Sequence, residues 1–291
     1  MSHPYAAEGY VAALADGEGE RAATIAAWNT AVLIRPIAAG GMDAAGAYPM
    51  AALGQESDVS AGLAQLAARG LVSVVLVADP LHGPPAERLA AAFALARPFK
   101  THYLVEPARF APNKHHRADI RRSQSRCQVE RVSLAAVLGD WMRLYSGLVD
   151  RHAIGGAAVF SDRYWRYIAG LAELETFAAY VEDEVVAMGL WLRHGGVGYN
   201  HLGASSAAGY AAGASYAVYA AAIDHHADCA VLNLGGGAGR RDDPSDGLAR
   251  FKRGFSTATA TAHLYGAVLD PERYAALSAG RETGFFPAYR G

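Results

Sequence analysis

A lysine that follows a run of glycines is the part of this sequence best equipped for chemistry. The stretch 229–255 predicts a short buried strand, then the consecutive glycines Gly235, Gly236 and Gly237, a charged turn and a helical segment containing Lys252. Glycine is favoured where the backbone takes a positive φ or approaches another group closely. Three glycines directly after a buried strand therefore predict a tight, functional turn whose backbone N–H groups can face an oxygen atom.

Lys252 is a candidate site residue because lysine is rare in this chain. The only lysines are Lys100, Lys114 and Lys252, although the sequence has 26 lysines and arginines together. A lysine kept in such an arginine-rich chain indicates a need for a compact ammonium group that can titrate, which a planar guanidinium does not supply. The alternative is that Lys252 is an ordinary solvated residue of a helix.

A second basic feature is the segment 114–126, which has five lysines and arginines and one aspartate. Its only large apolar residue, Ile120, leaves little to bury, so we expect a solvated face. Such a face predicts a cradle for phosphate groups, and the alternative is a solvated connecting helix. The predicted phosphate-binding residues are Lys114, Arg117, Arg121 and Arg122 from this segment, with Arg240 and Arg241 from the charged turn.

Several other chemistries lack their residue patterns. His225, His226 and Cys229 lie close in sequence, but no second cluster completes a set of three or four ligands, so we expect no metal. The glycine run does not open a crossover helix as a dinucleotide-binding fingerprint would, and a G-x-S-x-G nucleophile elbow is absent. Neither Cys127 nor Cys229 has the electropositive, exposed surroundings of a reactive thiol.

Composition predicts a soluble, cytoplasmic protein. The chain has 291 residues, 52% of them hydrophobic, and a net charge of −2, so no overall charge directs it to nucleic acid or membrane. Two cysteines give no disulfide framework. The N-terminal sequence lacks the pattern of a signal peptide, and no apolar run approaches the length of about 20 residues that a membrane span needs.

Hydrophobic periodicity predicts an α/β (α+β) fold in which helices alternate with strands in both halves of the chain. We expect strands at 31–37, 71–78, 101–105, 128–132, 176–181, 185–192, 197–202, 230–234 and 260–268. We expect helices at 6–14, 61–69 and 84–96, and others beginning at Ser133, Ser161, Ser215 and Pro271. The turn at Pro112-Asn113 and the basic segment predict a boundary between residues 1–125 and 126–291.

Acyl transfer to an amine fits these residues, because it requires an oxyanion to be stabilised and few other protein groups. The second half resembles the Fem family, peptidyltransferases that are related to the GNAT acetyltransferases and take amino acids from aminoacyl-tRNA. The resemblance covers about residues 113–280, and its most specific part is D-G-L-x-x-F-K-x-x-F behind L-G-G-G. It also includes the basic helix 116–122 and the strand that leads from Tyr199 to Ser205 and Ser206.

The resemblance implies two GNAT-like domains, each a mixed, largely antiparallel sheet flanked by helices, with the active cleft between them. It implies that residues 1–125 form the acceptor side and that residues 126–291 carry the glycine and Phe-Lys motifs. Lys252 would stabilise the oxyanion, Phe251 would pack against the tRNA terminus or the transferred residue, and Tyr199 would orient substrate. Further substrate-binding residues would be Asn200, Ser205, Ser206, Gly235, Gly236, Gly237 and Asp246.

The sequence also departs from the family. It has no pair of long helices for a coiled-coil arm and lacks the Q/R-x-x-G-x-G/A signature with which GNAT enzymes bind pyrophosphate, which argues against ordinary acetyl-CoA use. The resemblance implies aminoacyl-tRNA as co-substrate with no other cofactor. The acceptor would be an amine-bearing peptide, either a peptide-antibiotic intermediate that a carrier protein could hold or a cell-wall precursor. The open alternatives are an N-acyltransferase that uses acyl-CoA or a carrier-protein thioester, and a non-catalytic protein that binds tRNA or peptide.

Overall fold

The computed structural model describes residues 2–239, 242–281 and 284–291. The chain forms two compact units, the first made of Met1–Phe99 with Thr261–Gly291 and the second of Lys100–Ala260. This division differs from the predicted domain boundary after residue 125, since the segment 100–125 belongs with the second unit and the C-terminal residues with the first. The physical reason is strand pairing, because strands at both ends of the second unit also continue into the first.

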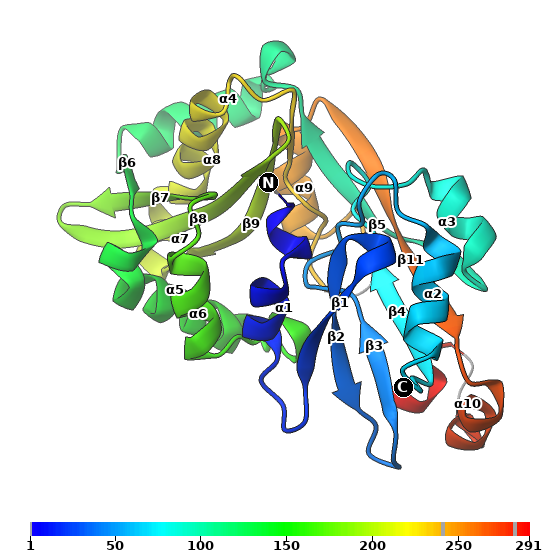
Figure 1. Ribbon diagram of the computed structural model, residues 1–291. Helices are drawn as coiled ribbons and strands as arrows, with labels where there is room; N and C mark the ends of the chain where they lie inside the picture. The colour runs from blue at the N-terminus through cyan, green and yellow to red at the C-terminus, as the bar shows by residue number, and fades with distance from the viewer. Residues whose placement is uncertain (1, 240–241, 282–283) are drawn as a thin grey trace. The chain divides into compact units, whose positions relative to one another are not determined.

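The first unit contains a mixed sheet, drawn in blue, cyan and orange in Figure 1. In the order in which they pair, its strands are β1 (Arg21–Ile25), β2 (Thr30–Pro36), β3 (Met42–Ala45), β4 (Ser73–Val77) and β11 (Ala258–Val268). All these pairs are antiparallel except β3 with β4, which is parallel. Its helices are α1 (Glu8–Leu14), α2 (Val59–Ala67), α3 (Ala86–Ala92) and α10 (Pro271–Ser278).

The first unit has its own apolar core, in which Trp28, Leu66, Leu76 and Phe93 are buried. Gly62 lets α2 pack closely on this core, because a Cβ at that position would lie 1.9 Å from the indole nitrogen of Trp28. That indole N–H donates to the Val59 carbonyl oxygen at 3.1 Å. The large aromatic ring therefore buries apolar area without leaving its polar atom unpaired.

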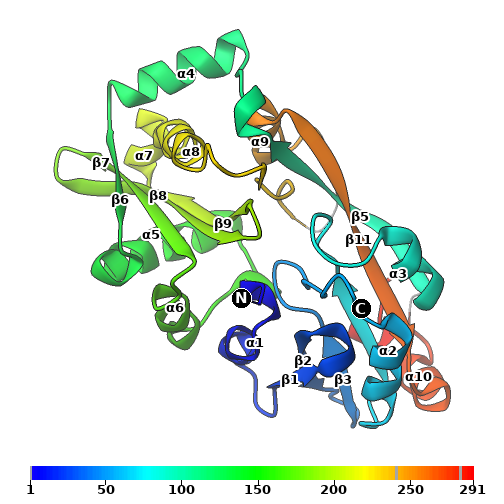
Figure 2. The same cartoon turned by 45° about the horizontal axis from the view of Figure 1, so that its top comes forward.

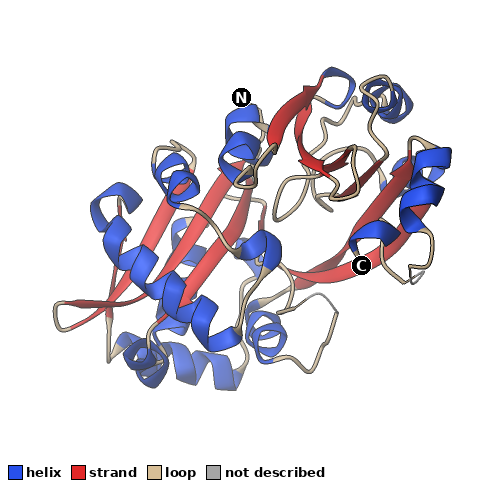
Figure 3. Ribbon diagram, turned by 90° about the horizontal axis from the view of Figure 1, so that it is seen from below, coloured by secondary structure: helices blue, strands red, loops and turns tan. Residues whose placement is uncertain are grey.

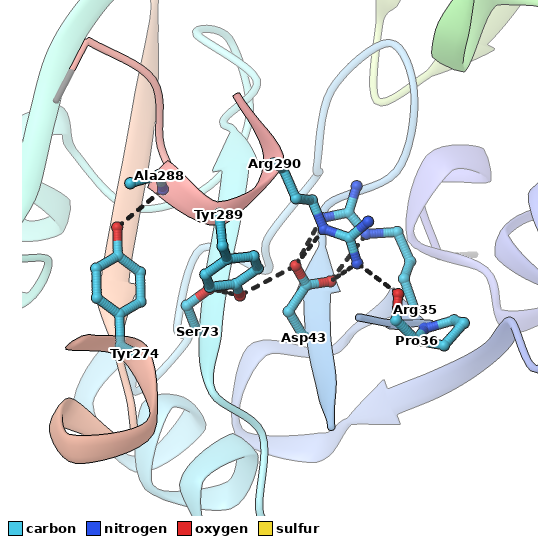
Figure 4. Close-up of polar contacts among 8 residues, drawn as sticks. All are labelled: Arg35, Pro36, Asp43, Ser73, Tyr274, Ala288, Tyr289 and Arg290. Carbon is cyan, nitrogen blue, oxygen red and sulfur yellow. Dashed lines mark hydrogen bonds and ion pairs between the residues drawn. The ribbon is translucent and has the colours of Figure 1, made fainter. Parts of the chain in front are cut away.

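A buried carboxylate joins the C-terminal residues to this sheet (Figure 4). Asp43, which is 0% exposed, accepts two hydrogen bonds from Arg35 at 3.0 and 3.2 Å and two from Arg290 at 2.6 and 3.0 Å. The Tyr289 hydroxyl contacts the same carboxylate at 3.2 Å and Ser73 Oγ at 2.7 Å. The charge of Asp43 is thus compensated by two guanidinium groups in bidentate geometry.

The second unit contains a mixed, largely antiparallel sheet. Its strands, in pairing order, are β5 (Leu95–Val105), β10 (Val231–Asn233), β9 (Val197–Ser205), β8 (Glu184–His194), β7 (Leu174–Val181) and β6 (Gln128–Val132). The pair β9 and β10 is parallel and the others are antiparallel. A register shift in β8 between Leu190 and Trp191 marks a bulge where β8 pairs with β9.

Helices cover both faces of this sheet. They are α4 (Lys114–Gln124), α5 (Leu138–His152), α6 (Asp162–Ala169), α7 (Ala207–Ala212), α8 (Ala214–His225) and α9 (Gly247–Phe255). Figure 2 shows α8, with α4 beside it, on one face of β7 and β8, and α5 with α6 on the other. Figure 3 distinguishes these helices, in blue, from the red strands. The aromatic side chains of α5 and α6 are core residues, because Trp165 packs edge to face against Trp141 and Tyr145 and all three are buried.

The predicted α/β class is confirmed, and most predicted elements are present. The helix predicted at 84–96 is too long, because it ends at Ala92 and β5 begins at Leu95. The side chain that caps α2 is Asp58, two residues before the expected Ser60, and β1 and β3 were not expected. Within the described residues, no helix is both long enough and apolar enough to span a membrane.

Candidate active site

Lys252 is buried against the glycine loop that follows β10. The residue is 7% exposed, and its Nζ donates a hydrogen bond to the Gly236 carbonyl oxygen at 2.8 Å. Gly235 has a φ of +74°, and a Cβ there would lie 3.3 Å from Nζ. Glycine at this position therefore allows a left-handed backbone and leaves room for the ammonium group. The alternative of a solvated helix residue is wrong for Lys252.

The start of α9 is tied to the same loop. Asp246 is the N-cap residue of α9, and its Oδ2 accepts hydrogen bonds from the backbone N–H groups of Ala249 at 2.9 Å and Ala238 at 3.0 Å. One side chain thus satisfies a free N–H of the helix terminus and fixes the end of the glycine loop. This explains why an aspartate precedes the helix that carries Lys252.

The other end of α9 packs closely on α4. A Cβ at Gly254 would lie 1.9 Å from the imidazole of His116, so only glycine fits there. The His116 Nε2 contacts the Phe251 carbonyl oxygen at 3.0 Å, and its ring stands edge-on to Phe255. Phe251 also packs edge-on against Tyr219 of α8. The predicted tRNA-facing residue Phe251 is half-buried in this aromatic cluster, which fixes the direction of the helix that carries Lys252.

A second lysine reaches the same loop from β5. Lys100 is 6% exposed, and its Nζ donates to the Ala238 carbonyl oxygen at 2.9 Å and lies 3.4 Å from that of Gly237. Thr101 holds the next part of the loop, because its N–H and Oγ1 both donate to Asp242, at 3.1 and 2.7 Å. Two buried ammonium groups therefore contact consecutive carbonyl groups of one loop.

Burial makes both lysines easier to deprotonate than a solvated lysine. The pKa of Lys252 is lowered from 10.5 to about 7, mainly by desolvation; the charge of Asp246 opposes this shift, and the charge of Lys100 adds a smaller contribution to it. Desolvation also lowers the pKa of Lys100, while Asp242, Asp246 and Asp243 oppose that shift. At neutral pH, Lys252 thus populates both the ammonium and the free amine forms, as acid–base groups in active sites often do.

His102 and Asn233 complete a polar group beside the lysines. Desolvation lowers the pKa of His102 to about 4, and the nearby charge of Lys252 adds to the shift, so the ring is neutral at pH 7. His102 is 8% exposed and Asn233 is 1% exposed. Among the described residues, neither His102 Nδ1 nor Asn233 Nδ2 has a partner in good hydrogen-bond geometry, although the Asn233 side chain opposes part of the fall in the pKa of His102. Unpartnered buried polar atoms are costly, and here they lie beside a titratable lysine.

This arrangement suits the stabilisation of a developing negative charge on a carbonyl oxygen. An ammonium group has three N–H donors, and Lys252 directs one at Gly236. The remaining donors, in surroundings that exclude water, can interact with an oxyanion more strongly than they would in solvent. The same nitrogen can exchange a proton near pH 7.

Comparison with known proteins finds a family model that matches the segment containing Lys252 and the glycine loop. Residues 114–253, slightly less than half of the chain, match the family model of the acetyltransferase (GNAT) domain. Comparison with curated protein sequences finds no significant match.

Solved structures extend the likeness to nearly the whole chain. FemX has a TM-score of 0.64 at 12% identity, with 92% of each chain covered. The C-terminal DUF2156 domain of a candidate lysylphosphatidylglycerol synthetase from Agrobacterium fabrum has a TM-score of 0.63 at 14% identity, covering 92% of this chain and 88% of that one. L-PGS from Bacillus licheniformis has a TM-score of 0.56 at 12% identity, covering 91% and 93%. The fold is of the GNAT and Fem type.

Within the GNAT-like segment, β9 carries predicted residues on opposite faces of the sheet. Tyr199 pairs with Asn233, which pairs in turn with Leu104, so Tyr199 shares a face with His102. Asn200 points to the other face, where its Oδ1 accepts from the Tyr219 hydroxyl at 2.7 Å. The register therefore groups Tyr199, which is buried, with the lysine site and separates Asn200 from it.

The two predicted serines have local partners at the end of β9. Ser205 is buried, and its Oγ lies 2.9 Å from Ser215 Oγ at the start of α8. Ser206 caps the six-residue helix α7, as its Oγ accepts from the Gly209 N–H at 3.1 Å. Both side chains thus have structural hydrogen bonds, and their role in binding substrate stays a prediction.

The predicted phosphate-binding residues of α4 lie on an exposed basic helix. Lys114, Arg117, Arg121 and Arg122 are all exposed. Asp119 neutralises part of this charge, because it pairs with Arg122 at 3.0 Å. Arg240 and Arg241 lie outside the described residues. The helix can contact phosphate groups, and it is also the element on which α9 packs.

The histidines that sequence analysis considered as metal ligands are paired with a carboxylate. His225 Nε2 and His226 Nε2 lie 2.9 and 2.6 Å from the two carboxylate oxygens of Glu175 on β7. In the part of the chain that the structure describes, no cluster of three or more histidine, cysteine or acidic residues could hold a metal ion. These groups therefore form a local histidine–carboxylate cluster at the end of α8.

Sequence reasoning missed Lys100 and His102 as members of the site. Two signals could have identified them. Lys100 is one of the three lysines in an arginine-rich chain, the same argument that selected Lys252. Lys100 and His102 also alternate along a strand, which puts both on one face. Both precede the segment 114–253 that matches the GNAT family model.

Proposed function

We propose that this protein is an acyltransferase that moves an aminoacyl group from aminoacyl-tRNA to an acceptor amine. The observation that carries the proposal is the Lys252 ammonium, buried against the Gly236 carbonyl oxygen at 2.8 Å. The GNAT family match and the fold shared with FemX support acyl transfer as the reaction class. The exposed basic helix α4 supports a donor that carries several phosphates.

In the proposed reaction, the acceptor amine attacks the ester carbonyl carbon of the aminoacyl-tRNA and forms a carbon–nitrogen bond. The carbonyl oxygen becomes an oxyanion that accepts a hydrogen bond from the Lys252 ammonium. The ester carbon–oxygen bond then breaks, and the tRNA hydroxyl leaves with a proton. Lys252 can take up the proton that the attacking amine loses and, as the ammonium, pass it to the departing ester oxygen, because the pKa of Lys252 is about 7.

The acceptor we propose is an amine-bearing peptide, either a peptide-antibiotic intermediate that a carrier protein can hold or a cell-wall precursor. Phe251 would pack against the tRNA terminus or the transferred residue. Tyr199, Ser205, Ser206 and the glycine loop with Asp246 would orient the substrates. Asn200, which was predicted for the same role, lies on the other face of the sheet, where it accepts a hydrogen bond from Tyr219. No cofactor besides the aminoacyl-tRNA co-substrate enters this scheme.

The decisive experiment mixes the protein with a pool of radiolabelled aminoacyl-tRNAs and candidate amines. We expect label to leave the tRNA and appear in an acid-stable amide, at a rate that falls about 10²–10³-fold in Lys252→Ala, the usual cost of removing one oxyanion donor. Lys114→Ala is the matched control, since it removes an exposed lysine and should alter tRNA affinity only. Equal turnover by wild type and Lys252→Ala would remove the assigned role of Lys252.

A second candidate function is N-acyl transfer from acyl-CoA or a carrier-protein thioester, and the GNAT family match favours it. Salt dependence separates the two donors. A tRNA that contacts several phosphate-binding residues should lose affinity with a log–log slope of about −0.7 to −0.9 per contact. Replacing both Arg117 and Arg121 with glutamine should then make the slope shallower, whereas a phosphopantetheine donor should give a shallow slope in all variants.

A third possibility is a protein that binds tRNA or peptide without catalysis. It predicts steep, salt-dependent tRNA binding together with no release of label from any aminoacyl-tRNA or acyl-CoA tested. The lowered pKa of Lys252 would then have no role in catalysis, and Lys252→Ala would leave tRNA binding unchanged.

A further inference from the structure

Lys100 is the feature of the site that the proposed mechanism leaves unused. It is as buried as Lys252, and its Nζ bonds to the Ala238 carbonyl oxygen at 2.9 Å. The Lys252 Nζ bonds to Gly236 of the same loop at 2.8 Å. Burying a second ammonium costs free energy unless it is compensated, and the arrangement keeps both charges at one short loop.

The loop itself is built to receive Lys100. The Cβ of a side chain at Gly236 would lie 3.2 Å from the Thr101 carbonyl oxygen and 3.3 Å from the Lys100 Cβ. The backbone of β5 therefore passes close beside the loop at a position where only glycine fits without a shift. The Tyr103 N–H extends this contact by donating to the Gly235 carbonyl oxygen at 3.1 Å.

We propose that Lys100 is a positioning residue for Lys252, one that holds the glycine loop in the conformation that receives Lys252 and repels the charge of the Lys252 ammonium. This inference rests on the proposed function for its role in catalysis. Its physical core, the coupling between the two lysines, can be measured without any substrate. A lysine beside another cationic group is a known way to obtain a neutral amine at physiological pH.

The charged groups around Lys252 show how Lys100 affects the pKa of Lys252. Asp246, the N-cap of the helix that carries Lys252, favours the ammonium form, and Lys100 on β5 disfavours it. His102, also on β5, is neutral at pH 7 and adds no charge. Asp242 and Asp243, from the turn after the loop, act on Lys100. Removing the Lys100 charge should therefore make Lys252 harder to deprotonate.

For the proposed reaction, Lys100 would act through Lys252 and not through the substrate. A positive neighbour keeps part of the Lys252 population as free amine at pH 7, which lets Lys252 take up the proton that the attacking amine loses. The proton then passes from the Lys252 ammonium to the departing ester oxygen. Without Lys100, Lys252 would remain an oxyanion donor, but a smaller share of it would be free amine and able to accept a proton near neutral pH.

The test uses the fact that the chain has three lysines. Protein labelled with ¹³C,¹⁵N-lysine should give three sets of side-chain NMR signals, which single substitutions assign to Lys100, Lys114 and Lys252. A pH titration of the Lys252 Cε signal in wild type should have its midpoint near 7. In Lys100→Gln, which keeps a hydrogen-bond donor but removes the charge, the midpoint should rise by about one pH unit.

Matched variants make the result decisive. Lys114→Gln makes the same change of charge on exposed α4 and should leave the Lys252 midpoint in place, and Lys100→Arg, which retains the charge, should do the same. Lys100→Met is a second charge-removing variant of similar size, which should fold even if Lys100→Gln does not, because an apolar side chain is readily buried. It should raise the midpoint as Lys100→Gln does.

A Lys252 midpoint that is equal in wild type, Lys100→Gln and Lys100→Met would overturn the proposal and leave Lys100 a structural residue. The NMR result is independent of turnover, so it stands even if no aminoacyl donor is found and the proposed function fails. Where transfer is observed, the limb of the kcat/KM–pH profile that reports Lys252 should shift to higher pH in Lys100→Gln, by the same number of pH units as the NMR midpoint. Lys100→Arg should restore the wild-type profile.

Discussion

Two buried charged residues, one in each unit, differ in the charge of their hydrogen-bond partners. Asp43 in the first unit is fully buried and accepts bidentate hydrogen bonds from both Arg35 and Arg290. Lys252 in the second unit is nearly as buried, yet its hydrogen bond within the described residues goes to a neutral carbonyl group. Opposite charge compensates Asp43 at contact distance, whereas Lys252 has another ammonium-bearing residue at the same loop.

This difference in partners indicates that Asp43 stabilises the fold, whereas Lys252 is suited to a chemical role. A buried ion that is paired in good geometry is held in one protonation state. A buried ion without such a partner responds by shifting its pKa toward the neutral form, and the pKa of Lys252 is about 7 as a result. Removing each charge should therefore affect different measurements.

The largest effect on stability is expected at Asp43. Asp43→Ala leaves the guanidinium groups of Arg35 and Arg290 without their common carboxylate, so the unfolding free energy should fall by about 3–5 kcal/mol. Urea denaturation followed by circular dichroism measures this change. Asp58→Ala, which removes an exposed helix cap, is the control and should cost about 1 kcal/mol. A loss at Asp43 no larger than at Asp58 would break the comparison.

At Lys252 the expected effect is on turnover. Lys252→Met should reduce acyl transfer by about 10²–10³-fold, because the oxyanion donor is gone. The unfolding free energy should stay the same or increase, since an apolar side chain of similar size replaces a buried ammonium. Kinetics and denaturation on the same preparation test both parts. A strongly destabilised variant would mean that Lys252, like Asp43, is structural.

The packing that supports Lys252 should matter next. Gly254→Ala forces α9 away from His116, because the new Cβ would lie 1.9 Å from the imidazole, and we expect a loss of about 1–3 kcal/mol in unfolding free energy. Gly247→Ala lies in the same helix with no atom within 4 Å of its Cβ. That control should be neutral or more stable by up to about 1 kcal/mol. Equal effects at the two glycines would argue against close packing of α9 on α4.

The effect that is smallest over any narrow pH interval is a pH-dependent difference in stability, which accumulates over several pH units. The pKa of Lys252 is lowered from 10.5 to about 7 on folding, so between these values the unfolded chain binds the proton that the folded chain has lost. Stability from this residue is therefore lowest below pH 7 and rises toward pH 10.5, by at most about 1.4 kcal/mol per pH unit. Subtracting the pH profile of Lys252→Met from that of wild type should reveal this slope. A flat difference would show that Lys252 keeps an ordinary pKa.

Local patterns in the sequence predict much of this site. The glycine run after a buried strand and the rarity of lysine both indicate Gly235 and Lys252, and the structure brings these residues together. The capping role of Asp246 follows the usual preference for aspartate at a helix start. What makes these residues predictable is that each is explained by its near neighbours in the sequence.

Lys100, His102 and the pairing of the strands required the three-dimensional structure. The contact between Lys100 and Ala238 joins residues that are 138 positions apart, and no local pattern encodes such a pairing. For the same reason, the predicted boundary after residue 125 separated β5 from β10, although Leu104 and Asn233 are partners in one sheet. Asp43 reads as an ordinary strand residue until Arg290 is brought beside it.

The first unit takes its residues from both ends of the chain, and this has a consequence for biosynthesis. Until residues 261–290 have been synthesised, β4 lacks its partner strand β11 and Asp43 lacks the guanidinium of Arg290. The second unit is complete once residue 260 has left the ribosome. During translation, the first unit therefore stays incomplete while the second unit can already fold. A nascent chain that stalls before residue 261 would have a folded second unit and a first-unit sheet in which β4 lacks its β11 partner.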